Sequence, residues 1–494
     1  MNEQIIFNCA RAMFGIAVLI FIAWLFSVDR KAISWNIVIK SLIIQIVIAF
    51  LVMFVAPVQD FFNFFGSCFV AVLGWTKAGS EFLFGAFVDT NKFGYIFAFQ
   101  ILPTIIFFSA FTSLLFYLGI LQKIVWLFAW LMSRLIKLSG AESLSTVANI
   151  FVGMNEAPLV VKPYIAKMTK SELMLVMTAG MSTMAGGVLA AYIGMLGNGI
   201  HELEVQFARH LLTASVMAAP GAVAISKILV PQTETVEQNV EIARDKLGAN
   251  VLEAISIGTI DGFKLAGNVA AMLLVFYALI AGGNSIISYL GGFRLMSALL
   301  FCLAVVGVCA SYLAIVVRTG KPSRIKLSRV KRYAIGFGVL SLLLAVAAMF
   351  CSFDETPNAI VSRLTEGRHT ALSMQLILGY IFAPVVWLTG VATQDIHLVG
   401  QLLGQKIILT EFVGYSELSE MLATNAFAET KSAIIATYVL CGFANFASVG
   451  IEIGGIGSIA PNQRATLSIF GMRALLGGTL AALISASIVG MTAV

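Results

Sequence analysis

Long runs of apolar residues without charge recur along the whole chain and are separated by short polar segments. A helix needs about 20 predominantly apolar residues to cross the hydrocarbon layer of a membrane, and most of these runs are long enough. The pattern therefore predicts an all-α polytopic membrane protein with about ten transmembrane helices. The apolar runs lie near 12–28, 41–59, 93–122, 173–200, 210–226, 265–293, 295–317, 334–353, 370–394, 432–451 and 474–494.

Three other apolar segments do not fit a simple span. The stretch 57–90 is rich in Phe and Gly and broken, which indicates an interfacial segment. The segments 143–168 and 396–416 are interrupted near their middles by charge and by Pro or Gly. The first apolar run has no clear small-residue cleavage site and leads into another span, so we interpret 1–27 as a retained helix.

The positions of Lys and Arg set the expected orientation, because cytoplasmic loops of membrane proteins carry an excess of both. The loop after the first span contains Arg30 and Lys31, and seven basic residues crowd 318–332, so both loops are expected inside and the N-terminus outside. The spans alternate consistently only if 143–168 enters and leaves from the inside and 396–416 from the outside. Both segments are therefore predicted to be re-entrant hairpins whose arms reach the middle of the membrane.

The two hairpins begin two halves of the chain with the same order of elements. In the first half, a helix with a small, polar patch at 180–186 follows, and then a helix near 207–230. In the second half, a helix with a similar patch at 442–448 follows, and then the terminal helix. Interrupted segments at corresponding places in two halves are typical of secondary transporters that bind substrate at the middle of the membrane. The sequence thus predicts an inverted repeat with a central site.

The composition agrees with a membrane protein. Hydrophobic residues make up 59% of the 494 positions and charged residues 11%, whereas a soluble domain carries about 25% charged residues. The net charge of +6 lies mainly between apolar segments, which favours membrane orientation over nucleic-acid binding. The six cysteines lie in or beside apolar stretches without paired spacing, so we interpret them as buried small residues, not metal ligands or disulfides.

Glu156 and Glu411 lie at the interrupted middles of the two hairpins. A carboxylate near the centre of a membrane is unfavourable unless it is satisfied. Hydrogen bonds to free amides at a hairpin tip explain one such residue, but two at equivalent tips favour a substrate site. The neighbouring candidates are neutral or acceptor groups with no Lys or Arg among them, which disfavours phosphate and dicarboxylate substrates. A sugar that carries a flat heterocycle suits this set.

Three segments carry a resemblance to a known family: GMNEAPLVVKPYIAKMTKSEL at 153–173, GQKIILTEFVGY at 404–415 and CGFANFASVGIEIGGIGSIAP at 441–461. They resemble signature stretches of the concentrative nucleoside transporters, and the similarity covers the chain except about 295–352. The resemblance implies a bacterial cation/nucleoside symporter that forms a homotrimer, with a scaffold domain and a mobile transport domain in each subunit.

The expected domain boundaries follow from the spans and from the resemblance. They are N-terminal scaffold helices at 1–140, the first hairpin and two transport-domain helices at 141–232, a loop and a scaffold helix at 233–294, a two-helix insertion at 295–352, and an interfacial helix, the second hairpin and the last two transport-domain helices at 353–494.

The resemblance also implies roles for individual residues. The residues that would hydrogen-bond the ribose hydroxyls or lie beside them are Glu411, Asn445, Ser448 and Phe443. The residues that would face the nucleobase are Met154, Asn155, Glu156 and Val188. The oxygen ligands of a sodium ion, which suit a hard cation, would be the Asn149 side chain, the Val152 carbonyl, Thr183 and the Met184 carbonyl.

The chain departs from the family pattern near these sites. Members usually carry Gly-Gln, then Thr or Ser, then Glu at the first tip, whereas this chain has Met154 and Asn155 before Glu156. Met154 cannot hydrogen-bond as an amide does, so the preference for purine or pyrimidine stays open, although Asn155 offers a partial replacement. Glu452 is an unusual charge beside the second-half site, for which a structural or solvated role is favoured over a proton site.

We therefore expect a secondary active transporter of the bacterial inner membrane that imports nucleosides. Sodium is favoured as the coupling ion because Asn149 and Thr183 are present, and proton coupling is the alternative. An intramembrane enzyme is disfavoured, since no His-x-x-x-His, Cys cluster or Asp-rich motif accompanies the glutamates. A passive channel is disfavoured because no continuous polar face is present.

Overall fold

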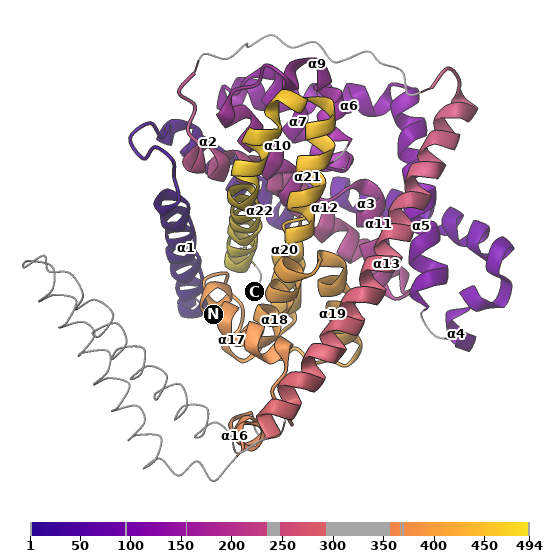
Figure 1. Cartoon of the computed structure of the whole chain (residues 1–494), viewed down its shortest axis with the longest axis vertical. Coiled ribbons are helices and arrows are strands. Elements are labelled where there is room, and N and C mark those ends of the chain that lie inside the picture. Colours follow the sequence, from indigo (N-terminus) through magenta and orange to yellow (C-terminus); the bar gives the residue numbers. More distant parts are fainter. Residues whose placement is uncertain are drawn as a thin grey trace, which may run out of the picture. The chain divides into compact units, whose positions relative to one another are not determined.

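The computed structural model describes residues 2–93, 96–154, 156–234, 248–292, 356–365, 367 and 370–492. Over these residues every regular element is helical, so the all-α class is confirmed (Figure 1). The chain divides into two compact units, Met1–Phe276 with Leu378–Val494, and Tyr277–Ile377. The predicted insertion at 295–352 lies outside the described residues.

Eight helical segments of the described chain are long and apolar enough to cross a membrane. This confirms the expected multi-pass membrane protein. The helices that form these segments are α1 (Asn2–Leu25), α2 (Trp35–Phe54), α3 (Ala56–Phe84), α5 (Phe97–Tyr117), α10 (Lys170–Ser182) with α11 (Gly186–Gly197), α12 (His201–Leu229), α13 (Val251–Gly292) and α22 (Arg464–Thr492). The shorter helices outside the hairpins and the repeat are η1 (Gly85–Val88), α4 (Thr90–Phe93), α6 (Ile120–Ile136), α16 (Pro357–Leu364), α17 (Met374–Trp387), η3 (Thr393–Asp395) and η4 (Pro461–Gln463).

The segment 57–90, which is predicted to be broken, is helical over most of its length and breaks at Gly85. Ala56–Phe84 is one continuous helix, which begins after the extended residue Val55 with Pro57 in its first turn. Proline is tolerated there because the first amides of a helix have no partner within it. Gly66, Gly74 and Gly79 lie inside this helix without interrupting it, as glycine is frequent in membrane helices. Gly85, with φ of 56°, ends it.

Both interrupted segments form helical hairpins. The first consists of α7 (Gly140–Phe151) and a return arm that Pro158 and Pro163 divide into α8 (Ala157–Val160) and α9 (Lys162–Ile165). The second consists of α18 (Ile396–Ile408) and α19 (Glu411–Ala423), joined by two non-helical residues.

The remaining elements repeat in the same order after each hairpin. The first hairpin precedes the interrupted pair α10–α11 and the 29-residue helix α12, and the second precedes the interrupted pair α20 (Thr430–Leu440) and α21 (Phe446–Ile459) and the 29-residue helix α22. The helices α12 and α22 pack against each other, and α10 and α20 both pack against α22. Figure 1 shows the yellow helices α21 and α22 running through the middle of the larger unit. The repeat predicted from the sequence is confirmed.

A buried polar network joins the beginnings of α7 and α10. Each helix begins with a capping box, Ser139 with Glu142 and Thr169 with Glu172, in which a hydroxyl and a carboxylate satisfy free amides of the first turn. The Ser139 hydroxyl also donates to Glu172 at 2.7 Å. Lys227 of α12 donates to the Glu142 carboxylate in an ion pair whose two side chains are each 2% exposed. The network therefore fixes the first hairpin to the two helices that follow it.

The second hairpin is also fixed at its base, by one carboxylate. Asp395 accepts hydrogen bonds from the backbone amides of Ala428 and Glu429, at 2.8 and 3.1 Å. These amides precede α20, so the start of the second hairpin is joined to the start of the interrupted helix. Both hairpins thus have fixed bases.

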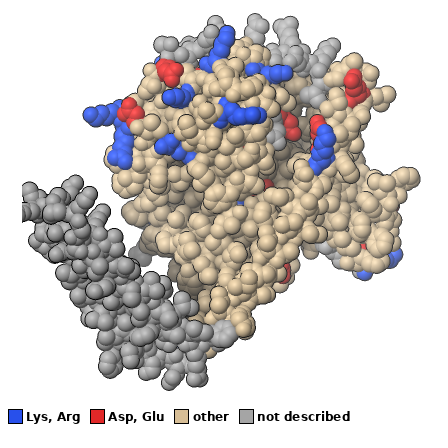
Figure 2. Space-filling model, in the orientation of Figure 1, with Lys and Arg blue, Asp and Glu red and all other residues tan. Residues whose placement is uncertain are grey.

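The charged side chains are distributed unevenly on the visible face. Figure 2 shows Lys and Arg gathered at the upper end of the view, above a broad region that carries almost no charge. Such a charge-free band suits contact with hydrocarbon, where an exposed charge is unfavourable. The surface thus agrees with the membrane spans.

We predict that replacing Glu142 by Leu lowers the free energy of unfolding by about 3–5 kcal/mol, because the buried charge of Lys227 then has no partner. The double variant Glu142→Leu/Lys227→Met is expected to return to near wild-type stability, since neither charge is left unpaired. Thermal unfolding of the purified protein in detergent measures both. Equal losses in the single and double variants would show that the pair itself is not the stabilising feature.

Candidate substrate and cation site

The two interrupted helices meet at their breaks. Gly442, with φ of 87°, lies so close to α10 that a Cβ atom there would be 2.5 Å from the carbonyl carbon and oxygen of Ser182. The neighbouring Cys441 thiol donates to the same carbonyl at 3.8 Å. Non-helical backbone within a membrane is tolerated only where it is buried in protein or lines a polar cavity. The breaks at 183–185 and 441–445 therefore form one polar centre.

The Glu411 carboxylate lies at this centre and is 3% exposed. Asn445 donates from Nδ2 to one carboxylate oxygen at 2.8 Å, and Tyr192 donates its hydroxyl to the other at 3.3 Å. The Asn445 Oδ1 accepts the backbone amide of Ser448 at 2.8 Å, which caps α21 and fixes the orientation of the amide. Glu411, Asn445 and Ser448, which the sequence assigns to one site, are thus close together.

Aromatic rings hold the carboxylate in place. The Tyr192 ring stacks on Tyr415 with centroids 4.0 Å apart and meets Phe412 edge-on at 4.9 Å. Tyr415 donates its hydroxyl to the Thr437 carbonyl at 2.9 Å. Phe443, which the sequence also assigns to this site, lies in the break before α21 and is 8% exposed. Rigid rings around a carboxylate fix its position before any ligand binds.

Lys406 is a part of the site that the sequence analysis missed. Its side chain is completely buried, and Nζ donates to the carbonyls of Val439 and Cys441 at 3.0 and 2.6 Å. These carbonyls belong to the end of α20, where the helix supplies no amide partners. The inference that no Lys joins the candidate residues is therefore wrong. Lys406 could have been recognised from the sequence, because it is the one Lys or Arg in an apolar arm of the second hairpin.

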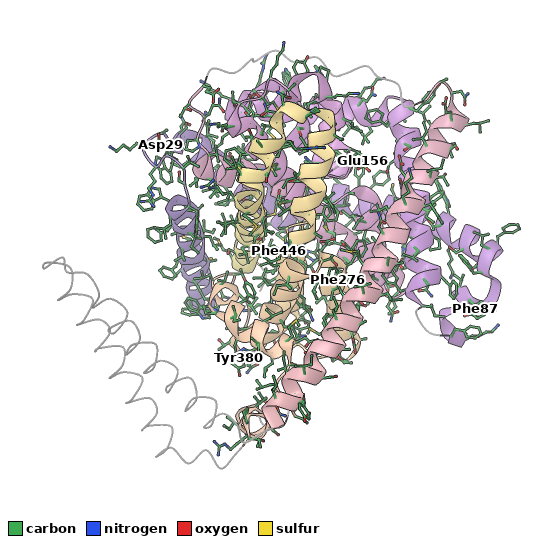
Figure 3. The ribbon with its side chains drawn as sticks, in the orientation of Figure 1. Asp29, Phe87, Glu156, Phe276, Tyr380 and Phe446 are labelled. Atoms are coloured by element: carbon green, nitrogen blue, oxygen red, sulfur yellow. The ribbon has the colours of Figure 1, made fainter. Side chains whose placement is uncertain are left out.

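The first hairpin tip is less closely connected to this centre. The Glu156 carboxylate accepts the amide of Gly153 in its own hairpin and stays exposed, and no hydrogen bond joins it to Glu411 in the described chain. Met154 is partly buried, Val188 is buried in the first turn of α11, and Asn155 lies outside the described residues. In Figure 3, Glu156 and the α21 residue Phe446 lie apart in the view. The structure thus does not pair the two hairpin glutamates.

The oxygen atoms expected to bind sodium lie where two helices end. Asn149 is 1% exposed, donates Nδ2 to the Ser145 carbonyl at 3.0 Å, and leaves its buried Oδ1 without a partner among the described residues. A Cβ atom on Gly186 would be 3.1 Å from the Phe151 carbonyl, so the end of α7 lies beside the start of α11.

The expected ligands Val152, Thr183 and Met184 flank these two chain segments. The Thr183 hydroxyl donates to the Ala179 carbonyl at 2.8 Å, which leaves its oxygen able to accept or to bind a cation. Free carbonyls give the end of a helix a partial negative charge. The unpaired Asn149 oxygen and these groups are all oxygen donors, the type of ligand that a hard cation prefers.

Two hairpins, two interrupted helices and a buried polar centre define a secondary membrane transporter. The profile described as "Na+ dependent nucleoside transporter C-terminus" matches residues 210–322 and 325–490, and the corresponding N-terminal profile matches 14–87. A further profile, described as "Nucleoside recognition", matches 98–199. The chain belongs to the Na+-dependent nucleoside transporter family, which is the family of the concentrative nucleoside transporters, and it is a nucleoside transporter and not an enzyme.

Similar proteins occur in bacteria and in animals. The chain is 35% identical over 486 residues to an uncharacterized transporter of Haemophilus influenzae, with 97% of each covered. It is 34% identical over 493 residues to sodium/nucleoside cotransporter 1 of Rattus norvegicus, and 33% identical over 495 residues to solute carrier family 28 member 3 of Eptatretus stoutii. These matches cover 97% of this chain but 63% and 60% of the relatives, so the chain spans about three fifths of the animal proteins.

Solved structures of CNTnw have the same fold. CNTnw in an inward-facing substrate-bound state matches with a TM-score of 0.77 and 32% identity, over 98% of this chain and 99% of that one. A doubly substituted variant of CNTnw in an outward-facing state matches with a TM-score of 0.78 and 31% identity, over 99% of both. The predicted family and the fold with re-entrant hairpins are confirmed.

We predict that Tyr192→Phe weakens nucleoside binding by several-fold to about 10-fold, because the carboxylate of Glu411 loses one of the two groups that orient it. Tyr415→Phe is the matched control, since its hydroxyl donates to a backbone carbonyl and not to Glu411. Calorimetric titration of the purified variants with uridine and adenosine measures the change. The same loss of affinity in both variants would contradict an orienting role of the Tyr192 hydroxyl.

Proposed function

We propose that this chain imports nucleosides across the bacterial inner membrane by sodium symport. The observation that carries the proposal is the hydrogen-bonded arrangement of Glu411, Asn445 and Ser448 beside the two helix breaks. Ribose offers two adjacent hydroxyl groups, and a carboxylate accepts two hydrogen bonds in a matching geometry. The Glu411 carboxylate is therefore the group that we propose selects a ribose.

The ribose is proposed to bind between the second hairpin and α21. Each oxygen of Glu411 has one protein donor and a further lone pair for a ribose hydroxyl. Asn445 and Ser448 supply groups that donate and accept, and Phe443 provides an apolar surface beside them. The base is proposed to extend toward Met154, Asn155, Glu156 and Val188.

The sodium ion is proposed to bind at the ends of α7 and α10. Asn149 and Thr183 supply side-chain oxygens, and Val152 and Met184 supply carbonyls, all of which are donors that a hard cation prefers. The ion would join the first hairpin to the interrupted helix that also contacts the substrate centre through Ser182. Occupation of the cation site would therefore order the substrate site, which is the basis of coupling.

Alternating access is proposed to depend on the two hairpins. Each hairpin covers the central site from one side, with the N-terminus outside and the first hairpin open to the cytoplasm. A transport domain made of both hairpins and α10–α12 with α20–α22 would move past scaffold helices, and three copies of the chain would share the scaffold as a homotrimer. Because the same central site would open first to one side of the membrane and then to the other, the substrate and the ion would cross together.

We predict that Glu411→Gln lowers uptake of uridine and adenosine by about 100-fold or more, because the amide accepts fewer hydrogen bonds and carries no charge. Uptake is measured in proteoliposomes with radiolabelled substrate. Glu420→Gln, at an exposed position of the same hairpin arm, is the control and is expected to transport normally. Uptake by Glu411→Gln at the wild-type rate would overturn the substrate site.

We predict that Thr183→Val raises the sodium concentration needed for half-maximal uptake by about 10-fold or more, because the cation loses an oxygen ligand. Thr178→Val is the matched control, since its hydroxyl donates to the Met174 carbonyl within the same helix, at 2.7 Å. Sodium and proton gradients are imposed separately on the proteoliposomes. Uptake that follows the proton gradient alone, in the wild type and in both variants, would show that protons drive transport.

A further inference from the structure

Glu452 of α21 is a buried carboxylate that the proposed site does not use. Its side chain is 1% exposed, and neither oxygen has a hydrogen-bond partner among the described residues. A solvated role is therefore excluded. A buried charged carboxylate without a partner costs several kcal/mol, so a ligand that donates hydrogen bonds to it would relieve this cost.

The carboxylate lies in a space that a glycine leaves open. A Cβ atom on Gly180 of α10 would overlap with an oxygen of Glu452 and would also lie 3.0 Å from the Cβ atom of Met154. Glu452, Gly180 and the first hairpin tip thus share one small region. The carboxylate reaches it because side chains on a helix point toward its N-terminus.

This region continues the face of α21 that carries the ribose residues. Asn445, Ser448 and Glu452 are spaced by three and four residues, which places them on one face of a helix, and all three are buried. Four residues correspond to about 6 Å along the axis, which is about the distance from a sugar to the far edge of its base. A nucleoside whose ribose binds at Asn445 and Ser448 can therefore present its base to Glu452.

We propose that Glu452 recognises the nucleobase, by accepting hydrogen bonds from adjacent N–H groups on its edge. This inference rests on the proposed ribose site and adds the base selectivity to it. Guanine is the base that matches a carboxylate best, since its ring N–H and its neighbouring amino group form two parallel donors. Inosine lacks the amino group, so Glu452 would favour guanosine over inosine by this second hydrogen bond.

The test compares guanosine with inosine as competitors of uridine uptake in proteoliposomes. The wild type is expected to prefer guanosine by about 10-fold, the effect of one hydrogen bond to a charged group. Glu452→Leu is expected to remove this preference, and Glu420→Gln is expected to keep both the preference and the wild-type rate of uridine uptake.

The outcomes distinguish a failure of the proposed role of Glu452 from a failure of the proposed function. Equal competition by guanosine and inosine in the wild type overturns the role of Glu452. If the wild type takes up no nucleoside at all, the proposed function itself is overturned. If Glu452→Leu does not fold, the isosteric Glu452→Gln is measured by direct binding, and an unchanged preference overturns the inference. A Gln variant that keeps the preference but alters the pH dependence of uptake identifies Glu452 as a proton site instead.

Discussion

The close contact of two interrupted helices is the constraint on which the rest of this structure depends. Gly442 approaches the Ser182 carbonyl so closely that any side chain at position 442 would collide with it. The positive φ of Gly442 is readily accessible only to glycine and a few other residues. Both breaks are brought together at this point, and each supplies backbone groups that no helix satisfies.

The side chains around this contact satisfy most of the groups that the breaks set free. Lys406 binds the carbonyls at the end of α20, and Asn445 accepts an amide at the start of α21. In the first half, Asn149 lies near the end of α7, and its side-chain oxygen has no hydrogen-bond partner among the described residues. Unpaired polar groups are unfavourable in a membrane. Asn149 and Glu452 are among the buried side chains whose oxygens have no partner in the described chain, and the proposed ligands would satisfy them.

The sequence predicted the fold well because the spans and hairpins depend on local patterns. Apolar runs, Lys and Arg in the loops, and charge within an apolar segment all carry their meaning without knowledge of distant residues. Glu411, Asn445 and Ser448, which the resemblance assigns to one site, lie close together, since Asn445 bonds both the Glu411 carboxylate and the Ser448 amide. The interpretation of 57–90 as broken fails over Ala56–Phe84, because glycines that weaken helices in water are tolerated in membrane helices. It holds at Gly85, where the helix ends.

What the sequence did not predict are contacts between residues far apart in the chain. The bonds from Lys406 to α20 span 33 and 35 residues, and the bond from Tyr192 to Glu411 spans 219. Such contacts depend on which faces of two helices meet, and a pattern along one helix does not contain that information. The symmetry of the two hairpins suggested a symmetric pair of glutamates, but tertiary packing made them different.

This difference between the glutamates has a physical reason. Glu411 begins a continuous helix and meets donors from two other elements, Asn445 and Tyr192. Glu156 precedes a return arm that two prolines divide, and its carboxylate turns back to the amide of Gly153. In the described chain, the Glu156 carboxylate is held only by a bond within its own hairpin, whereas the Glu411 carboxylate is held by donors from two other elements. A side chain held in this second way is preorganised for binding. The proposed ribose end of the site is thus held by tertiary contacts, whereas Glu156 at the proposed base end bonds within its own hairpin.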